Sequence, residues 1–266
     1  MRTALFIGLW LLSSSIWAAA QPDPFPQVAS AYLVEIDGAV VWERHSSRPL
    51  PPASLTKLMT ALLVLEQDRL KDTASISRAA ARETGSRLSL KVGERFRVQD
   101  LLAATLIESA NDACHALADH LAGSEAAFVE RMNRRAQELG LHSTRFKNSC
   151  GHDASGHYST ARDLTLLAHE LLRHPQLLPL TSQPHTTITT LDGKTYQLSS
   201  KNALIGRYDG ALGLKTGYTA QAGKCLVAYA KRSGHDVLLV MLHGHDRWWD
   251  AADILDLAFA HARNTH

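Results

Sequence analysis

Ser54-Leu-Thr-Lys57 opens the stretch SLTKLMTALLVLEQD at residues 54–68. The leucines, methionine and valine of this stretch fall on nearly every face of a helix, and a helix that is apolar all round is a buried one. The serine and the lysine stand at i and i+3, so their side chains lie on one face. The stretch therefore predicts a central helix whose N-terminus carries a hydroxyl and an amine side by side.

Strand signals lie on both sides of this helix in the sequence. Upstream, two β-rich runs, Ala31–Ile36 and Ala39–Glu43, are joined by Asp37-Gly38, a strong hairpin signal. Downstream of Pro184 the chain becomes strand-like again, and a closing helix is expected from about 246 to 262. The expected downstream strands are Thr186–Leu191, Thr195–Ser199, Leu212–Tyr218, Cys225–Lys231 and Val237–His243.

Helical signals dominate between about residues 70 and 180. Apolar residues recur there with a 3.6-residue period, and Gly123 and Gly140 are helix stops. The expected helices are Arg97–Leu106, Ser109–Leu121, Ser124–Leu139 and Thr160–Leu172. The pattern predicts an α/β (α+β) fold, in which an antiparallel sheet flanked by helices forms one lobe (about 28–68 and 182–264) and a mostly helical insertion (about 69–181) forms the other.

The N-terminal residues predict export. Residues 1–20 read MRT, then the apolar run ALFIGLWLLSSSIW, then AAA. A positively charged start, a short apolar core and an A-x-A site are typical of a cleaved signal peptide; an uncleaved anchor is the alternative. With 28 basic and 26 acidic side chains, the chain offers no electrostatic case for nucleic acid or an anionic membrane surface. The three cysteines, Cys114, Cys150 and Cys225, allow at most one disulfide, with three buried thiols as the alternative.

Ser54 and Lys57 are candidates for nucleophilic catalysis. A serine hydroxyl is a poor nucleophile until a base takes its proton. A lysine serves as that base only when its pKa is lowered, which burial and a second nearby cation both achieve. The apolar helix supplies the burial, and Lys215 is the candidate for the second cation. An ordinary surface serine and lysine is the alternative for this motif taken alone.

Two further motifs follow in order, Ser109-Ala-Asn111 and Lys215-Thr-Gly217. Ser109 is a plausible N-cap of the helix that follows it, and a catalytic interpretation makes it a proton relay, with Asn111 binding the substrate amide. Lys215 and Thr216 offer a cation and a hydroxyl for a substrate carboxylate. Gly217 allows another backbone to approach its strand closely.

The backbone N–H groups of Ser54 and Tyr218 are candidates for an oxyanion hole. Together, a serine with a lysine one turn away, a hydroxyl-plus-amide element and a strand-borne Lys-Thr-Gly describe a serine acyl-transfer site.

With these residues placed, the chain resembles the low-molecular-mass penicillin-binding proteins, the serine D-alanyl-D-alanine carboxypeptidases. The similarity runs from about Val34 to Phe259. The segments that carry it are Pro52-Ala-Ser-Leu-Thr-Lys-Leu-Met-Thr60, Glu108-Ser-Ala-Asn-Asp-Ala-Cys114, Gly156-His-Tyr-Ser-Thr-Ala-Arg-Asp163 and Gly213-Leu-Lys-Thr-Gly-Tyr-Thr219. The resemblance implies one catalytic domain over residues 21–266.

The resemblance also implies roles for single residues. Ser54 becomes the acylated nucleophile and Lys57 the base. Ser109 and Asn111 complete the proton relay and the substrate clamp. Lys215 and Thr216 would hold the terminal carboxylate of the substrate. Arg247 lies near the sequence position of a family arginine that helps to bind this carboxylate. Lys201 and Asn202 fall where the family often has an Arg-Asn pair.

Two departures from the family pattern stand out. Gly151-His152-Asp153 replaces the usual Gly-Leu-Asp beside the site. The β-rich domain and the amphipathic anchoring helix that follow the catalytic domain in many relatives are not seen here. We therefore expect a soluble, periplasmic, monomeric enzyme without a stable membrane anchor.

The implied reaction removes the terminal D-alanine of peptidoglycan stem peptides through an acyl-enzyme on Ser54, which β-lactams also acylate. No cofactor is implied. A DD-endopeptidase that cleaves peptide cross-links is the main alternative. A class A β-lactamase is a weaker one, because no E-x-x-L-N segment occurs between Leu139 and Leu180. A catalytically silent β-lactam or peptidoglycan sensor is another.

A metal site is not expected. His243-Gly-His245-Asp246 supplies two histidines and an aspartate, but a third well-spaced zinc ligand is not evident. A turn at the end of a strand is the favoured interpretation of this segment.

Overall fold

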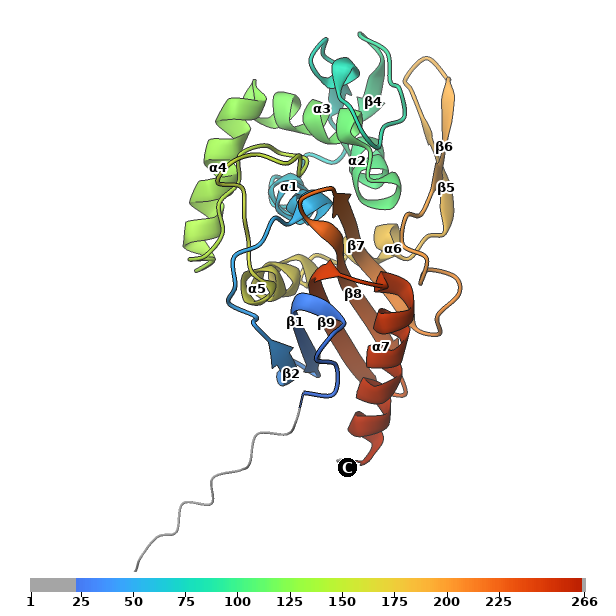
Figure 1. Cartoon of the computed structure of the whole chain (residues 1–266). Coiled ribbons are helices and arrows are strands. Elements are labelled where there is room, and N and C mark those ends of the chain that lie inside the picture. Colours follow the sequence, from blue (N-terminus) through green and yellow to red (C-terminus); the bar gives the residue numbers. More distant parts are fainter. Residues whose placement is uncertain (1–22, 265–266) are drawn as a thin grey trace, which may run out of the picture.

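The computed structural model describes residues 23–264, built around a five-stranded antiparallel sheet (Figure 1). The strands follow the order β2-β1-β9-β8-β7, so the N-terminal hairpin pairs with the last strand of the chain. Their bounds are β1 Ala29–Ile36, β2 Ala39–Arg44, β7 Ala211–Thr219, β8 Gly223–Arg232 and β9 His235–Gly244. The expected hairpin and the three C-terminal strands are confirmed, and the predicted signal peptide lies outside the described residues.

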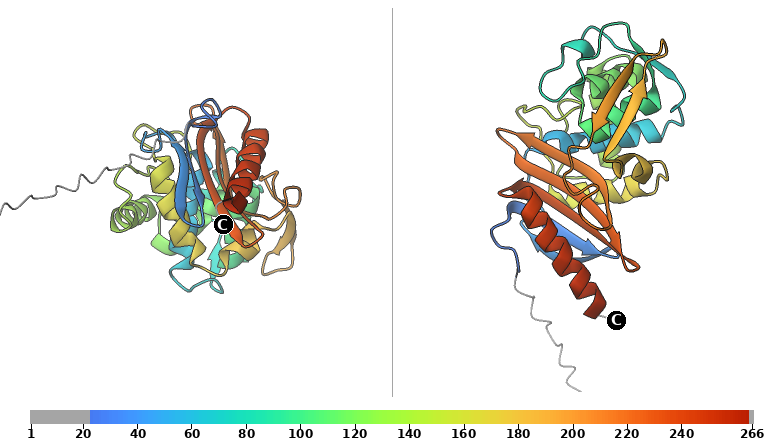
Figure 2. Two further views of the ribbon diagram at one scale, coloured as in Figure 1. Left: turned by 90° about the horizontal axis from the view of Figure 1, so that it is seen from below. Right: turned by 90° about the vertical axis from the view of Figure 1, so that its right-hand side faces the viewer.

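Helices cover both faces of the sheet, as the view along the sheet in Figure 2 shows. Helix α7 (Arg247–Asn264) packs on one face, and α5 (Ala161–Leu172) packs on the other, where it also contacts α1 (Lys57–Leu65). The side-chain period of two explains how β1 serves both layers: Leu33 lies in the core shared with α1, and Val34 lies in the core shared with α7.

The second lobe is mostly helical. It contains α2 (Val98–Ala103), α3 (Asn111–Ala122), α4 (Glu125–Glu138) and a small sheet of β3 (Thr73–Ser75) and β4 (Arg95–Arg97). The lobe joins the large sheet through one continuous apolar core that includes α1. Every residue of α1 is buried, in agreement with its all-apolar pattern.

The β5–β6 hairpin departs from the expected arrangement of lobes. Strands β5 (His185–Thr189) and β6 (Thr195–Ser199) form a separate two-stranded sheet beside α6 (Leu177–Thr181). They contact α2 and the turn at 104–108, so they lie against the helical lobe although their residues fall in the range expected for the sheet lobe. Among residues 23–264, no helix combines the length and apolar character that a membrane span requires.

Candidate active site

Ser54 and Lys57 lie at the junction of the two lobes. Ser54 is in a 3₁₀ turn (Ala53–Thr56), and Lys57 is the first residue of α1. The Nζ of Lys57 donates to the Oγ of Ser54 at 3.1 Å. Lys57 is completely buried, whereas Ser54 is partly exposed. The geometry thus places a hydroxyl on a partly exposed serine within hydrogen-bond distance of a buried amine.

Lys57 has two further acceptors, both at 2.6 Å: the Oδ1 of Asn111 and the backbone oxygen of Cys150. A lysine side chain has at most three N–H donors, so the three contacts use all of them. Asn111 in turn donates its Nδ2 to the backbone oxygen of Thr84 at 2.6 Å. Its amide, which we expected to bind substrate, is therefore engaged at both ends and fixes the position of Lys57.

Ser109 has an unusual backbone. It follows a π-helical turn (Ala104–Glu108) and adopts a left-handed conformation with φ of 60°. The expected N-cap role is wrong: Ala110 occupies the N-cap position of α3, and no side chain caps it. The Oγ of Ser109 instead accepts a hydrogen bond from Lys215 Nζ at 2.8 Å. A π-turn and a left-handed serine are strained features of the kind that gather at functional sites.

Lys215 is on β7, and its side chain is 1% exposed. Besides Ser109, it donates to the backbone oxygen of Thr216 at 2.8 Å. Burial, and after it the charges of Lys57 and Arg247, hold the pKa of Lys215 well below its ordinary value. Neither of its hydrogen-bond acceptors carries a charge, so its contacts position the amine without neutralising it.

Gly217 brings β7 against the nucleophile turn. A Cβ at this position would lie 3.0 Å from the Cβ of Ala53 and 3.0 Å from the backbone N of Ser54. This tight fit agrees with the close approach expected from the sequence. The following residue, Tyr218, turns its side chain outward and is 67% exposed. The interpretation of its N–H and that of Ser54 as an oxyanion hole stays a prediction.

Arg247 is the first residue of α7, and its side chain hydrogen-bonds the backbone of β7 and β8. Its Nη1 donates to the backbone oxygens of Gly217 (2.7 Å) and Cys225 (3.0 Å). Burial lowers the pKa of this guanidinium. The other two residues suggested by resemblance lie nearby: Asn202 donates to the backbone oxygen of Gly213 at 3.4 Å, and Lys201 pairs with Glu108 at 2.6 Å.

The loop at 148–153, which the resemblance places beside the site, takes part in it through contacts that no motif predicts. Its Cys150 carbonyl holds Lys57, and a Cβ on Gly151 (φ +91°) would overlap the carbonyl oxygen of Ala53. The replacement of Gly-Leu-Asp by Gly151-His152-Asp153 marked this loop in the sequence without revealing its contacts. All three cysteines of the chain are free and buried.

His243, His245 and Asp246 do not gather as metal ligands within residues 23–264. The group of ligand atoms that does converge in this part of the chain belongs to Glu83, His115 and Glu125.

Comparison with known proteins places this geometry in a family. The family model for D-alanyl-D-alanine carboxypeptidase (Peptidase_S11) matches residues 18–246. D-alanyl-D-alanine carboxypeptidase DacF of Bacillus subtilis is 36% identical, over 98% of this chain and 71% of its own length. Penicillin-binding protein D2 of Listeria monocytogenes, solved in an ampicillin-bound form, aligns with a TM-score of 0.77 and 34% identity over 88% of this chain and 98% of that one. A D-alanyl-D-alanine carboxypeptidase of Mycobacterium tuberculosis aligns with a TM-score of 0.84 and 30% identity over 91% and 95%. The chain belongs to the D-alanyl-D-alanine carboxypeptidase family.

Proposed function

We propose that the protein is a serine D-Ala-D-Ala carboxypeptidase that removes the terminal D-alanine from peptidoglycan stem peptides. The observation that carries this proposal is the 3.1 Å contact between Lys57 Nζ and Ser54 Oγ, with the lysine buried and the serine partly exposed. Within hydrogen-bond reach, a base can take the proton of a nucleophile as it attacks.

The proposed reaction has two halves. In acylation, Lys57 reacts as the neutral amine, after giving up one of the three protons it donates in the resting site. It takes the proton of Ser54, and Oγ attacks the carbonyl carbon between the two D-alanines. The oxyanion is stabilised by the N–H groups of Ser54 and Tyr218. The C–N bond then breaks, and a proton reaches the departing nitrogen through Ser109, which Lys215 holds at 2.8 Å. In deacylation, water attacks the ester carbonyl, the shortened peptide leaves with a new terminal carboxyl group, and the Oγ of Ser54 regains a proton.

The carboxylate of the terminal D-alanine fits the cationic end of the site. This end of the site is formed by Lys215 and Thr216 on β7 and by Arg247 at the start of α7. The hydrogen bonds of Lys215 and Arg247 there go to uncharged oxygens. A bound carboxylate would supply the negative charge that these side chains lack, through charge-assisted hydrogen bonds. It would also raise the lowered pKa of Lys215.

Covalent labelling tests the nucleophile. Wild-type protein should be acylated by a fluorescent penicillin at Ser54, located by peptide mass spectrometry. Ser54→Ala should lose all labelling while keeping its circular-dichroism spectrum and Tm. Ser46→Ala, which changes a buried serine that donates to Glu43, is the matched control and should label normally. Labelling that survives in Ser54→Ala would show that the nucleophile is misassigned.

Cleavage of cross-links is the second candidate. A cavity of about 600 Å³ borders Arg247 and is lined also by His185, Lys201, Asn202 and Trp248. That space suits a leaving group larger than D-alanine, as a DD-endopeptidase requires. A pentapeptide ending in D-Ala-D-Ala and a cross-linked muropeptide dimer, assayed in parallel by mass spectrometry, distinguish the two. Release of D-alanine without dimer cleavage supports the carboxypeptidase, and dimer cleavage alone would replace it with the endopeptidase.

The penicillin-labelling experiment and the peptide assay together address the remaining alternatives. Rapid hydrolysis of penicillin would favour a β-lactamase, and stable labelling of Ser54 without turnover of either peptide would favour a sensor. The signal-peptide pattern of residues 1–20 supports export to the periplasm, where peptidoglycan lies. We propose that the enzyme acts there in cell-wall biogenesis and the maintenance of cell shape.

A further inference from the structure

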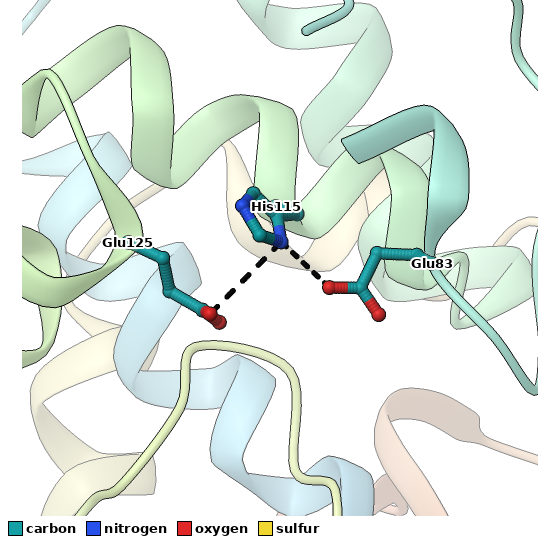
Figure 3. A group of neighbouring side chains, drawn as sticks. All are labelled: Glu83, His115 and Glu125. Carbon is teal, nitrogen blue, oxygen red and sulfur yellow. Dashed lines mark hydrogen bonds and ion pairs between the residues drawn. The ribbon is translucent and has the colours of Figure 1, made fainter. Parts of the chain in front are cut away.

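A cluster of histidine and glutamate side chains lies beside the catalytic centre. Figure 3 shows that Glu83 and Glu125, from separate parts of the helical lobe, both point at the imidazole of His115. The Nδ1 of His115 is 2.6 Å from Glu83 Oε1 and 4.0 Å from Glu125 Oε2. One ligand atom from each of the three residues lies within 4.8 Å of the others.

We propose that Glu83, His115 and Glu125 bind a divalent transition-metal ion, with Zn²⁺ as the best match. Imidazole nitrogen and carboxylate oxygen are zinc ligands at about 2.0–2.2 Å, which sets ligand atoms of a tetrahedral site about 3.3 Å apart. On metal binding, the distance from His115 Nδ1 to Glu83 Oε1 would lengthen from 2.6 Å. The distance from His115 Nδ1 to Glu125 Oε2 would shorten from 4.0 Å. Each change is smaller than one ångström. Three protein ligands leave the fourth position for water or an anion.

Each of the three ligands already has an outer partner that orients it. Ser149 donates both its backbone N (2.9 Å) and its Oγ (2.6 Å) to Glu125 Oε1, which leaves Oε2 facing His115. His152 Nε2 lies 2.7 Å from the second oxygen of Glu83. Asp119 Oδ1 faces the other ring nitrogen of His115 at 3.6 Å. Such partners hold ligating carboxylates and histidines in a fixed orientation in metal sites.

The charges around His115 also favour a cation. Three carboxylates, those of Glu83, Asp119 and Glu125, surround one imidazole at 2.6, 3.6 and 4.0 Å. A divalent cation bound between Glu83, His115 and Glu125 would be attracted by all three of these negative charges.

The site would connect two supports of the catalytic lysine. Glu83 precedes Thr84, whose carbonyl holds Asn111, and Ser149 precedes Cys150, whose carbonyl holds Lys57. An ion bound by Glu83 and, through Glu125, linked to Ser149 would brace both loops. It would lie outside the reacting groups, so the site is independent of the reaction proposed above and is tested by binding.

The test uses the purified protein without a histidine tag, stripped of metal with a chelator and titrated with Zn²⁺ by isothermal calorimetry at neutral pH. We expect one Zn²⁺ per chain and a Tm that rises with zinc. Glu125→Gln, which keeps the acceptor for Ser149 but loses the charge, and His115→Gln should each weaken binding about 100-fold or more. Asp119→Asn, which alters an outer partner, should weaken it about tenfold.

His169→Gln is the matched control. His169 pairs with Glu35 at 2.6 Å on a different face, and no third ligand converges there within the described residues. This variant should bind zinc like the wild type. Absence of binding, or equal binding by His115→Gln, would overturn the proposal. If a variant unfolds, the visible spectrum of wild-type protein loaded with Co²⁺ decides: a four-coordinate spectrum supports the site, and the spectrum of the aqueous ion refutes it.

Discussion

His157 gives the protein a specific sensitivity to acid. It is 5% exposed, and its ring packs edge-on against Phe146. Nδ1 lies 3.4 Å from the Nδ2 of Asn148, whose Oδ1 is held by the backbone N–H groups of the following loop. The asparagine therefore presents a donor, Nδ1 is the acceptor, and Nε2–H donates to Thr56 Oγ1 at 2.9 Å. The hydrogen bonds fit the neutral ring.

The magnitude follows from the pKa. Burial, the largest cause, lowers the pKa of His157 to about 4 from 6.5. On acidification the unfolded chain binds a proton at this residue before the folded protein does. The stability contributed by the neutral ring is thus complete above pH 6.5 and is lost as the pH falls toward 4. The whole difference is roughly 3 kcal/mol, and about 2 kcal/mol of it is lost by pH 5.

Urea unfolding at about pH 7.5 and about pH 5 measures this loss. His157→Gln cannot titrate but keeps a donor for Thr56, so it is compared with the wild type at both values. The free energy of unfolding of the wild type should fall by about 2 kcal/mol more than that of the variant. Groups that titrate in both proteins, such as His115 and Glu83, cancel in this difference. Equal losses in the two proteins would refute the assignment of a buried neutral His157.

Three further predictions concern the catalytic centre and its supports. Lys57→Ala should slow acylation by a fluorescent penicillin by about 100-fold or more, as loss of a general base implies; a stopped-flow loss of tenfold or less would move the base elsewhere. Gly217→Ala places a methyl group 3.0 Å from Ser54 N and should slow the same acylation about tenfold or more with an unchanged Tm. An unchanged rate would mean that β7 shifts to accommodate the methyl group without disturbing Ser54. Thr60→Val removes a buried 2.7 Å hydrogen bond to the carbonyl of Ser149 and should lower the free energy of unfolding by about 1 kcal/mol, measured with urea; equal stability would contradict the role of this bond.

The fold could be predicted from the sequence because its signals are local. The Asp37-Gly38 turn, the 3.6-residue periods and the three motifs each depend on neighbouring residues. Strand β1 ends at Ile36, directly before the turn, and β2 begins at Ala39, directly after it. The pairing of β1 with β9 spans almost the whole chain, and the general rules of sheet assembly predict a sheet without its strand order. The separate β5–β6 sheet shows the same limit, since a hairpin signal does not say which surface the hairpin covers.

The residues that converge at the candidate site were predictable from the sequence, and the contacts that support them were not. Ser54, Lys57, Ser109 and Lys215 occur in motifs with fixed spacing. The carbonyl of Cys150 is a backbone group and has no sequence signal. Ser109 was expected as an N-cap because serine favours that position, but the preceding π-turn displaces it by one residue and gives its hydroxyl to Lys215. Local preference was overridden by a conformation that tertiary contacts impose.

The supports also explain the electrostatics of the centre. Lys57, Lys215 and Arg247 are oriented by amide, hydroxyl and carbonyl oxygens, such as those of Cys150 and Gly217. A carboxylate in these places would hold the side chains equally well, but it would pair with them and cancel the positive potential. Neutral acceptors orient the basic groups and leave that potential directed at the space beside Ser54. Burial, and after it the charges of Lys57 and Arg247, lowers the pKa of Lys215, and no carboxylate among its hydrogen-bond acceptors opposes that shift. The proposed recognition of an anionic terminus and the proposed proton relay would therefore both depend on the same choice of hydrogen-bond partners.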